Sequence, residues 1–148
     1  MQSFEEIMST TDQKTLALWA ADCAEHVLPY FEEHYPDDHR PRSAIEAGRA
    51  WARGEIKVGQ ARAAALAAHA AARESIDGAA RAAARAAGHA AATAHVGRHA
   101  LGPVIYGARA AFTAADYTEA EAASAREQAW QYQRLLERRG TAWRQQSD

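Results

Sequence analysis

Histidines are the residues of this chain best suited to chemistry, and four of them lie in its alanine-rich middle: His69, His89, His95 and His99. His95 and His99 are four residues apart, a spacing that places two imidazoles on one helix face and that zinc sites use. His69 or Asp22 could supply a third ligand. No HExxH motif, second cysteine or nearby acidic residue accompanies the pair, so we expect no metal. We instead expect structural histidines that bond to neighbouring helices. His89 falls on a different helix face from His95, so all four cannot cluster without a bend.

A second polar group lies in the segment DDHRPRSAIEAGR, residues 37–49. In a helix that begins at Pro41, Arg42 and Glu46 form an i,i+4 pair, and Glu46 and Arg49 form an i,i+3 pair. Such a ladder needs only a solvated face. The alternative is a semi-buried network, which could pin two helices together or bind an anionic ligand. This network would join Asp22 or Glu25 of the preceding helix to Arg40, Arg42 or Arg49.

Other kinds of site have little support in the sequence. Cys23 lies among apolar positions, where an inert core thiol is the usual finding. No glycine-rich phosphate loop or strained serine turn is present, and we expect no cofactor. Arg81, Arg85 and Arg98 could suggest nucleic-acid binding. The isoelectric point near 6.4 and the absence of interleaved aromatic residues argue against a nucleic-acid partner.

The elements that must position these residues are dominated by an alanine-rich pair of segments between Lys57 and Phe112. Alanine loses no side-chain entropy in a helix, which predicts helices over about 58–75 and 79–101. Gly102 and Pro103 should end or kink the second helix, with a continuation over 104–113. Helices with methyl groups at the contact can approach closely, so we expect these two to lie side by side.

The rest of the chain should cover this pair. Thr11 or Asp12 can cap a first helix that Pro29 interrupts or restarts, and another helix should run over 42–53 and stop near Gly54. A last helix should begin after Asp116 or Thr118 and end at Gly140. The predicted fold is all-α, a compact antiparallel bundle of five to seven helices around a central alanine-rich helix pair. We expect one domain over residues 1–148, with a loose leader over 1–10 and a frayed tail over 140–148.

Alanine supplies much of the 48% hydrophobic content, so larger side chains must provide most of the buried area. The candidates for the core are Trp19, Leu28, Tyr30, Phe31, Ile45, Trp51, Leu66, Leu101, Ile105, Tyr106, Phe112, Trp130, Leu135 and Trp143.

The net charge of −2 conceals an uneven distribution along the chain. Residues 1–40 carry nine acidic and two basic side chains, whereas residues 41–113 carry four and ten. Either the acidic helices pack beside the basic ones, or the acidic face meets a basic partner. A single cysteine excludes an internal disulfide and suits a reducing cytosol. The acidic start and the interrupted alanine runs predict neither a signal peptide nor a membrane span, so we expect a cytoplasmic protein without a membrane partner.

Three passages together resemble the Imm-5-like group, a family of bacterial immunity proteins of polymorphic-toxin systems. They are LALWAADCAEHVLPYFE, DDHRPRSAIEAGRAWARGE, and AAHAAARE with AARAAGHAAATAHVGRHALGPVIYGARAA. The first two carry the specific positions, since alanine tracts match many helical proteins. The matching positions are Trp19, Asp22, Cys23, Glu25, Arg40, Pro41, Arg42, Glu46, Arg49, His69, His95, His99 and Tyr106. The segment after about Thr113 has no counterpart in this pattern.

The resemblance implies a cytosolic helical protein that binds and neutralises a cognate protein toxin without catalysis. Inhibitor surfaces use exposed aromatic and charged side chains, whereas histidines on alanine-rich helices should point inward. This contrast motivates an alternative from another class, a pocket that binds or converts a small polar molecule. The pocket would be lined by Asp22, Arg42, Glu46, His95, His99 and Tyr106. A homodimer through exposed alanine faces is a third alternative.

Overall fold

The computed structural model describes residues 2–147, and within them every regular element is a helix. The α-helices are α1 (Phe4–Ser9), α2 (Gln13–Val27), α3 (Pro29–Glu32), α4 (Arg40–Ala52), α5 (Val58–Glu74), α6 (Gly78–Ala92), α7 (Leu101–Ala114) and α8 (Ala120–Ser147). Two short 3-10 helices, η1 (Gly97–Ala100) and η2 (Tyr117–Glu119), precede α7 and α8. The prediction of an all-α bundle is therefore confirmed.

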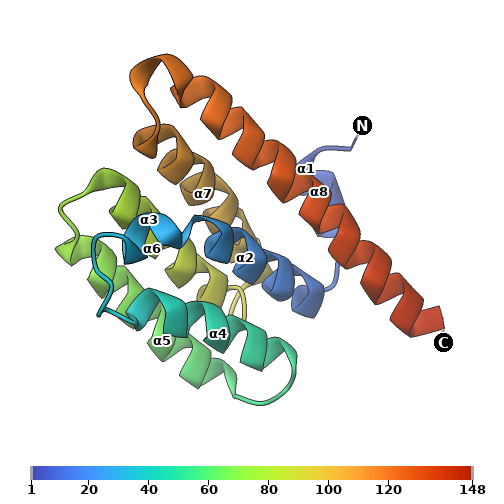
Figure 1. Cartoon of the computed structure of the whole chain (residues 1–148). Coiled ribbons are helices and arrows are strands. Elements are labelled where there is room, and N and C mark those ends of the chain that lie inside the picture. The colour runs from blue at the N-terminus through green and yellow to red at the C-terminus, as the bar shows by residue number, and fades with distance from the viewer. Residues whose placement is uncertain (1, 148) are drawn as a thin grey trace.

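The six longer helices form two layers. In one layer α6 lies between α5 and α7, and in the other α2 lies between α4 and α8. Between the layers, α4 contacts α5 and α6, α2 contacts α6 and α7, and α8 contacts α7. Figure 1 shows α4 and α5 together at one side of the molecule and α7 with α8 at the other. Each layer therefore has an inner face in the core and an outer face toward solvent.

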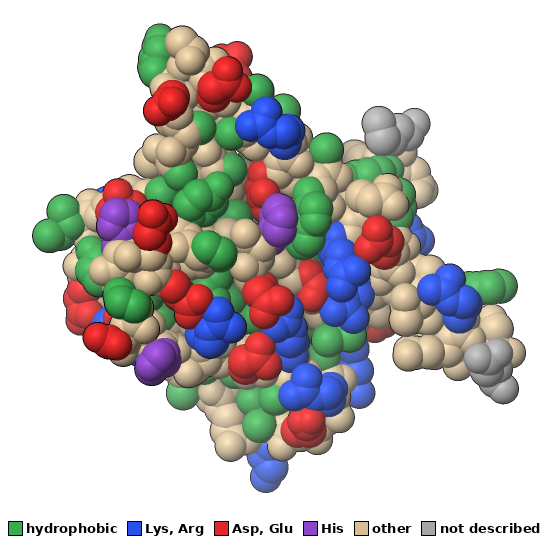
Figure 2. Space-filling view, viewed as in Figure 1, with side chains coloured by type: hydrophobic (Ala, Val, Ile, Leu, Met, Phe, Trp, Pro, Cys, Tyr) green, Lys and Arg blue, Asp and Glu red, His purple; other side chains and the backbone are tan. Residues whose placement is uncertain are grey.

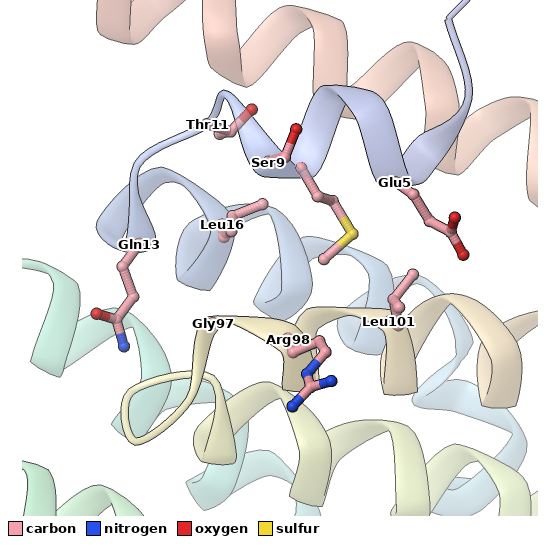
Figure 3. A pocket seen from close by; sticks show the side chains of 9 residues that line it. Glu5, Ser9, Thr11, Gln13, Leu16, Gly97, Arg98 and Leu101 are labelled. Atoms are coloured by element: carbon pink, nitrogen blue, oxygen red, sulfur yellow. The ribbon is translucent and has the colours of Figure 1, made fainter.

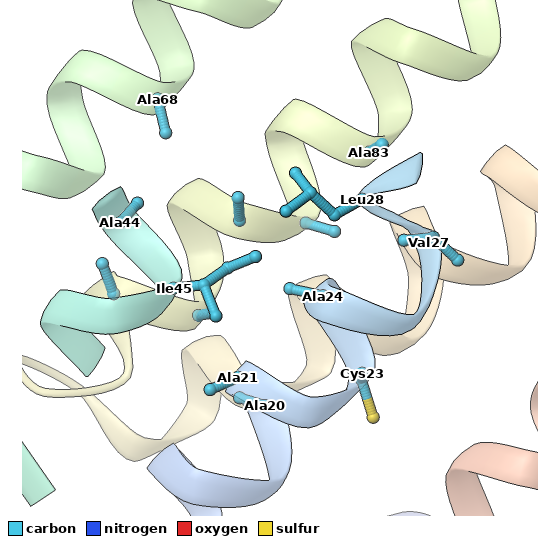
Figure 4. Packing of buried hydrophobic residues seen from close by; sticks show 14 of the residues in the cluster. Ala20, Ala21, Cys23, Ala24, Val27, Leu28, Ala44, Ile45, Ala68 and Ala83 are labelled. Atoms are coloured by element: carbon cyan, nitrogen blue, oxygen red, sulfur yellow. The ribbon is translucent and has the colours of Figure 1, made fainter. Parts of the chain in front are cut away.

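Methyl groups line most of the contact between the two layers. α6 buries ten of its fifteen residues, nearly all of them alanine, and Figure 4 shows Ala83 of α6 near Leu28 and Val27. The helices approach closely enough that a Cβ added to Gly48 of α4 would lie 3.2 Å from the Ala90 carbonyl oxygen of α6. As predicted, α5 packs against α6; α5 lies at the edge of its layer, where Leu66 faces outward.

The fourteen large residues predicted for the core divide into three groups. Five are half-buried: Tyr30, Trp51, Leu101, Tyr106 and Trp130. Trp19, Leu28, Phe31, Ile45 and Leu135 are fully buried, as the sequence predicts. Four other candidates are exposed, so their assignment to the core was wrong: Leu66 at 63%, Ile105 at 53%, Phe112 at 46% and Trp143 at 69%. Because alanine fills the inner faces of α5 and α7, longer side chains on these helices stand on the outer side.

The predicted helix over 79–101 was also wrong in its extent, because α6 ends at Ala92. The hydroxyl of Thr93 donates to the His89 carbonyl, and Val96 takes an extended conformation before η1. From α2, the side-chain amide of Gln13 donates to the carbonyls of Thr93 and Ala94 at 3.0 and 3.2 Å. This contact satisfies carbonyls that the helix leaves without partners and fixes the bend.

Both ends of the chain are helical. Residues 4–9, within the expected loose leader, form α1, which has a capping box between Ser3 and Glu6 and buries Ile7 completely. At the other end α8 passes through Gly140 and continues to Ser147. Gly54 has the positive φ of 77° expected for a helix stop, whereas Gly140 does not. Met1 and Asp148 lie outside the described residues.

Candidate functional site

The carboxylate of Asp22 is the centre of a buried ion-pair cluster between α2, α4 and α8. Asp22 is 6% exposed, and three guanidinium groups donate to it. Arg49 of α4 lies 3.2 Å from Oδ1, Arg134 of α8 lies 2.9 Å from Oδ2, and Arg138 donates to both oxygens at 2.7 and 2.9 Å. Burial alone would raise the pKa of Asp22, but Arg138, Arg134 and Arg49 together hold it below its usual value.

Exposed carboxylates complete the cluster at its outer edge. Arg49, itself only 15% exposed, also donates to Glu25 and Glu46 at 2.8 Å. Arg134 donates to Glu137 at 2.9 Å. In Figure 2 acidic and basic side chains accordingly alternate across the face formed by α2, α4 and α8. The structure thus contains the semi-buried network that the sequence left as an alternative to a solvated ladder.

Two of the predicted arginines belong to separate ion pairs. Arg42 donates to Glu32 of α3 at 2.6 and 2.8 Å. Arg40 donates to Asp38 and also to Glu74 of α5. These contacts tie the first turn of α4 to α3 and α5, so neither arginine reaches Asp22.

Arg134 and Arg138 are the functional residues that sequence reasoning missed. They are four residues apart on α8 and face α2 together. The spacing predicts a common helix face, but the sequence does not indicate which helix that face meets. Only the packing of α8 beside α2 brings the two arginines to Asp22.

A groove of about 450 Å³ lies beside the cluster, between α2 and α8. His26 and Trp130 form its wall as a parallel stack, with ring centroids 3.7 Å apart and planes inclined by 2°. The buried carboxylate of Glu127 lies 2.7 Å from His26 Nδ1. Asp22 lines the groove, but none of the other five residues of the predicted polar pocket does.

A second cluster, here called the histidine stack, joins α5, α6 and the start of α7. It consists of His69, His89, His99 and Tyr106. The ring centroid of His89 lies 4.9 Å from that of His69, 5.6 Å from that of His99 and 5.4 Å from that of Tyr106. The bend after α6 therefore assembles three of the four central histidines, and His95 remains on the surface.

Two glycines make room for these rings. A Cβ on Gly88 would lie 2.6 Å from the His69 ring, and one on Gly102 would lie 2.2 Å from Cγ of His89. Distances this short do not occur, so each imidazole occupies the space that a side chain at the glycine would need. The packing accounts for Gly88 in the alanine-rich α6 and for Gly102 at the start of α7.

Within the histidine stack, burial favours the neutral forms of His69 and His89. Burial lowers the pKa of His69 to about 4, helped by the neighbouring His89 and Arg85. Burial also lowers the pKa of His89, with His99 and Arg85 acting in the same direction. Arg85 lies 2.9 Å from Nδ1 of His69, so this nitrogen accepts and Nε2 carries the proton.

The helical His95–His99 pair considered as a metal site does not form, because the chain bends between the two residues. Among residues 2–147 no group of three or more His, Cys, Asp or Glu side chains has an arrangement that could hold a metal ion. Cys23 is fully buried, and burial raises the pKa of its thiol far above the usual value, with Asp22 and Glu127 adding to the effect. The thiol is therefore unreactive.

Another pocket, of about 490 Å³, lies under α1 and against the bend before α7 (Figure 3). Met8, Leu16 and Leu101 give it an apolar lining, and Arg98 lies at one side. None of the candidate residues predicted from the sequence lines this pocket. Across residues 2–147 no helix has the length and hydropathy needed to cross a membrane.

Comparison with known proteins gives one match. The model of the family described as "Imm-5 like putative immunity protein" matches residues 6–138, a span that includes the whole Asp22 cluster and the histidine stack. Neither the curated proteins nor the solved structures contain a match. Because the family model covers most of the 148 residues, the chain belongs to the Imm-5 like immunity family.

Proposed function

We propose that this protein binds one cognate protein toxin in the cytoplasm and neutralises it by occlusion, without catalysing a reaction. Membership of an immunity family supports the assignment to a toxin partner. The absence of catalysis is supported mainly by Asp22, because every hydrogen-bond acceptor position of its carboxylate is occupied. Both of its oxygens accept from guanidinium groups, so its ionised carboxylate has no free position from which to activate a substrate.

Two further groups support the same proposal. Burial raises the pKa of the Cys23 thiol, and Nδ1 of His69 accepts from Arg85. A catalytic pocket would require several of Asp22, Arg42, Glu46, His95, His99 and Tyr106 to converge. Of these six residues only Asp22 lines the groove beside it. Asp22 and Arg42 instead hold helices together through ion pairs, as parts of a rigid binding scaffold.

The stoichiometry of protection tests this proposal. The probe is the purified protein encoded by the gene adjacent to that of this chain, whose toxic activity is titrated with increasing amounts of the immunity protein. An occluding inhibitor should protect up to the equivalence point at one molecule per toxin and should elute with it as a complex. Protection by a small fraction of an equivalent would indicate catalysis and contradict the proposal.

His95→Ala provides the matched variant. His95 is exposed and lies outside both clusters, so an occluding inhibitor should keep the same equivalence point. An enzyme that used the predicted pocket would lose protection at all ratios.

A further inference from the structure

The outer face of α5, α6 and α7 differs from the opposite face of the molecule in its charge. Arg62, Leu66 and Arg73 lie on one face of α5, as their spacing requires. His69 lies next to this face, where α5 meets Arg85 of α6. α6 contributes Arg81 and Arg85. These side chains are exposed or half-buried, because the alanines of the same helices occupy the inner side.

α7 continues this surface on the other side of α6. Ile105, Arg109 and Phe112 are exposed, and the Arg109 guanidinium lies 5.2 Å from the centre of the Tyr106 ring. Two contacts fix the alignment of α7 with α6: His89 against Gly102 at one end, and Thr113 against Gly78 at the other. We call the whole surface the basic face; it comprises Arg62, Leu66, Arg73, Arg81, Arg85, Ile105, Arg109 and Phe112.

The carboxylates of the central segment do not neutralise this face. Glu46 pairs with Arg49, Glu55 with Arg53, and Glu74 with Arg40, and Asp77 lies 3.6 Å from His34. Within residues 2–147, no carboxylate oxygen lies within 4.0 Å of the guanidinium groups of Arg62, Arg73, Arg85 or Arg109.

Exposed apolar side chains stand among these arginines. Leu66 is 63% exposed, Ile105 53% and Phe112 46%, and a hollow of about 390 Å³ lies between Ile105, Phe112 and Gln128 of α8. Arginine and aromatic side chains beside a hollow are the combination that supplies most of the binding energy at protein interfaces. On α2, α4 and α8, by contrast, Arg49, Arg134 and Arg138 are paired with carboxylates of the Asp22 cluster.

From this composition we infer that the basic face is the surface that docks the partner, and that the partner presents an acidic protein surface with an apolar centre. The inference rests on the proposed function and adds the site and the chemistry of the partner. We infer an acidic partner because its charge is complementary to the arginines of the basic face. A second copy joined by a two-fold axis would place arginine over arginine. A nucleic-acid duplex presents mainly phosphates on its outside, which would not cover Leu66 and Ile105, and the net charge of the chain is −2.

The first experiment needs no toxin. Amide NMR spectra of the full chain are recorded while poly-L-glutamate is added, and the perturbed amides should map to the basic face. The double variant Arg73→Glu/Arg109→Glu should bind the polymer about tenfold more weakly, because two exposed cations become anions. Arg144→Glu makes the same change of charge on the projecting end of α8 and should alter affinity less than about twofold. Perturbations centred on α2, α4 and α8, or none, would overturn the inference.

The second experiment uses the protein encoded by the adjacent gene. Wild type and Arg144→Glu should bind it equally, and the double variant should bind about a hundredfold more weakly, with a smaller dependence on salt. Equal binding by the double variant would refute the docking surface and leave the proposed function intact. Absence of binding by the wild type would refute the proposed function. The poly-L-glutamate experiment would still test whether the basic face binds an acidic partner. Preferential binding of a DNA duplex over poly-L-glutamate would assign the face to nucleic acid and refute an acidic protein partner.

Discussion

At the level of single residues, Asp22 shows how the energetic cost of burying a charge is offset. A carboxylate removed from water loses its hydration, and this loss must be offset by close, well-directed donors. Arg49, Arg134 and Arg138 supply them from two different helices, and Glu25, Glu46 and Glu137 in turn balance two of these arginines. Asp22 therefore contributes to stability mainly because its removal would leave three cations without their shared anion.

The substitution Asp22→Asn tests this role. The amide keeps the shape but not the charge, so the free energy of unfolding should fall by about 2 to 3 kcal/mol, near the lower limit for a broken buried pair because Arg134 and Arg138 retain some solvent. Chemical denaturation at pH 7 measures the change. Glu46→Gln is the control: its carboxylate is 53% exposed, and the loss should stay below about 0.5 kcal/mol. Equal losses in both variants would show that the burial of Asp22 has no special effect.

His69 gives the molecule a dependence on pH. Its pKa is lowered to about 4 in the folded protein, below the value of 6.5 for an unperturbed histidine, so the unfolded chain binds the proton first. This contribution to stability is fully present above pH 6.5 and is lost as the pH falls toward 4. Because the ring is half-exposed, solvent screening reduces the loss to about 1 to 2 kcal/mol.

Denaturation curves of wild type and His69→Gln between pH 7 and 5 measure this effect. The carboxylates with lowered pKa values, such as Glu25, add their own loss only below their ordinary value of 4.5, so the window isolates the histidines. The variant should show a flatter profile than wild type, since glutamine does not titrate. Parallel profiles for the two proteins would mean that His69 does not carry the effect.

At the scale of elements, glycine positions determine how closely the helices of the alanine-rich layer pack. Gly102 lies in the first turn of α7, where alanine would normally stabilise a helix. The ring of His89, however, fills the place of the missing side chain. The histidine stack and the contact between α6 and α7 therefore depend on the absence of one methyl group.

Gly102→Ala should lower the free energy of unfolding by about 1 to 3 kcal/mol, because the new methyl group would force His89 out of the stack. Gly59→Ala is its counterpart in the first turn of α5, where nothing lies within 4 Å of the added Cβ. That variant should be neutral or more stable by up to about 1 kcal/mol. Thermal unfolding of the two variants separates the steric clash with His89 from the effect of helix propensity. If Gly102→Ala were more stable than wild type, the predicted clash with His89 would be disproved.

At the scale of the whole molecule, the two layers separate two kinds of surface. The outer face of α4, α2 and α8 contains the ion pairs around Asp22, whereas the arginines of the basic face have no carboxylate partners among the described residues. The acidic and basic segments of the sequence thus neutralise each other only in part: Asp22 and Glu25 pair with Arg49, and Glu32 pairs with Arg42.

This division of charge predicts a monomer. Symmetric pairing through the basic face would bring arginines together, a repulsion that acts fully at ionic strengths below about 0.1 M. Sedimentation velocity at low salt should therefore show one species with the mass of a single chain. A dimer under these conditions would favour the homodimer through the central helices and argue against an unpaired basic face.

Most of the local structure could be predicted from the sequence. Alanine runs, Asp12 as a cap, Pro29 as an interruption and Gly54 as a stop act through the backbone within a few residues, so most of the helices were predictable. The ends of α6 at Ala92 and of α8 at Ser147 were not. The semi-buried network around Asp22 could be stated only as one alternative. Which alternative holds depends on α8, because two of its arginines complete the cluster.

The bend after Ala92 and its consequences depend on contacts between distant parts of the chain. The side chain of Gln13, eighty residues away in the sequence, fixes that bend, and the bend in turn brings His99 to His89 and leaves His95 outside. The same holds for Leu66, Ile105 and Phe112, whose spacing is compatible with either side of a helix. Helical period specifies which residues share a face, and the packing of one layer on another specifies whether that face meets the core or the solvent.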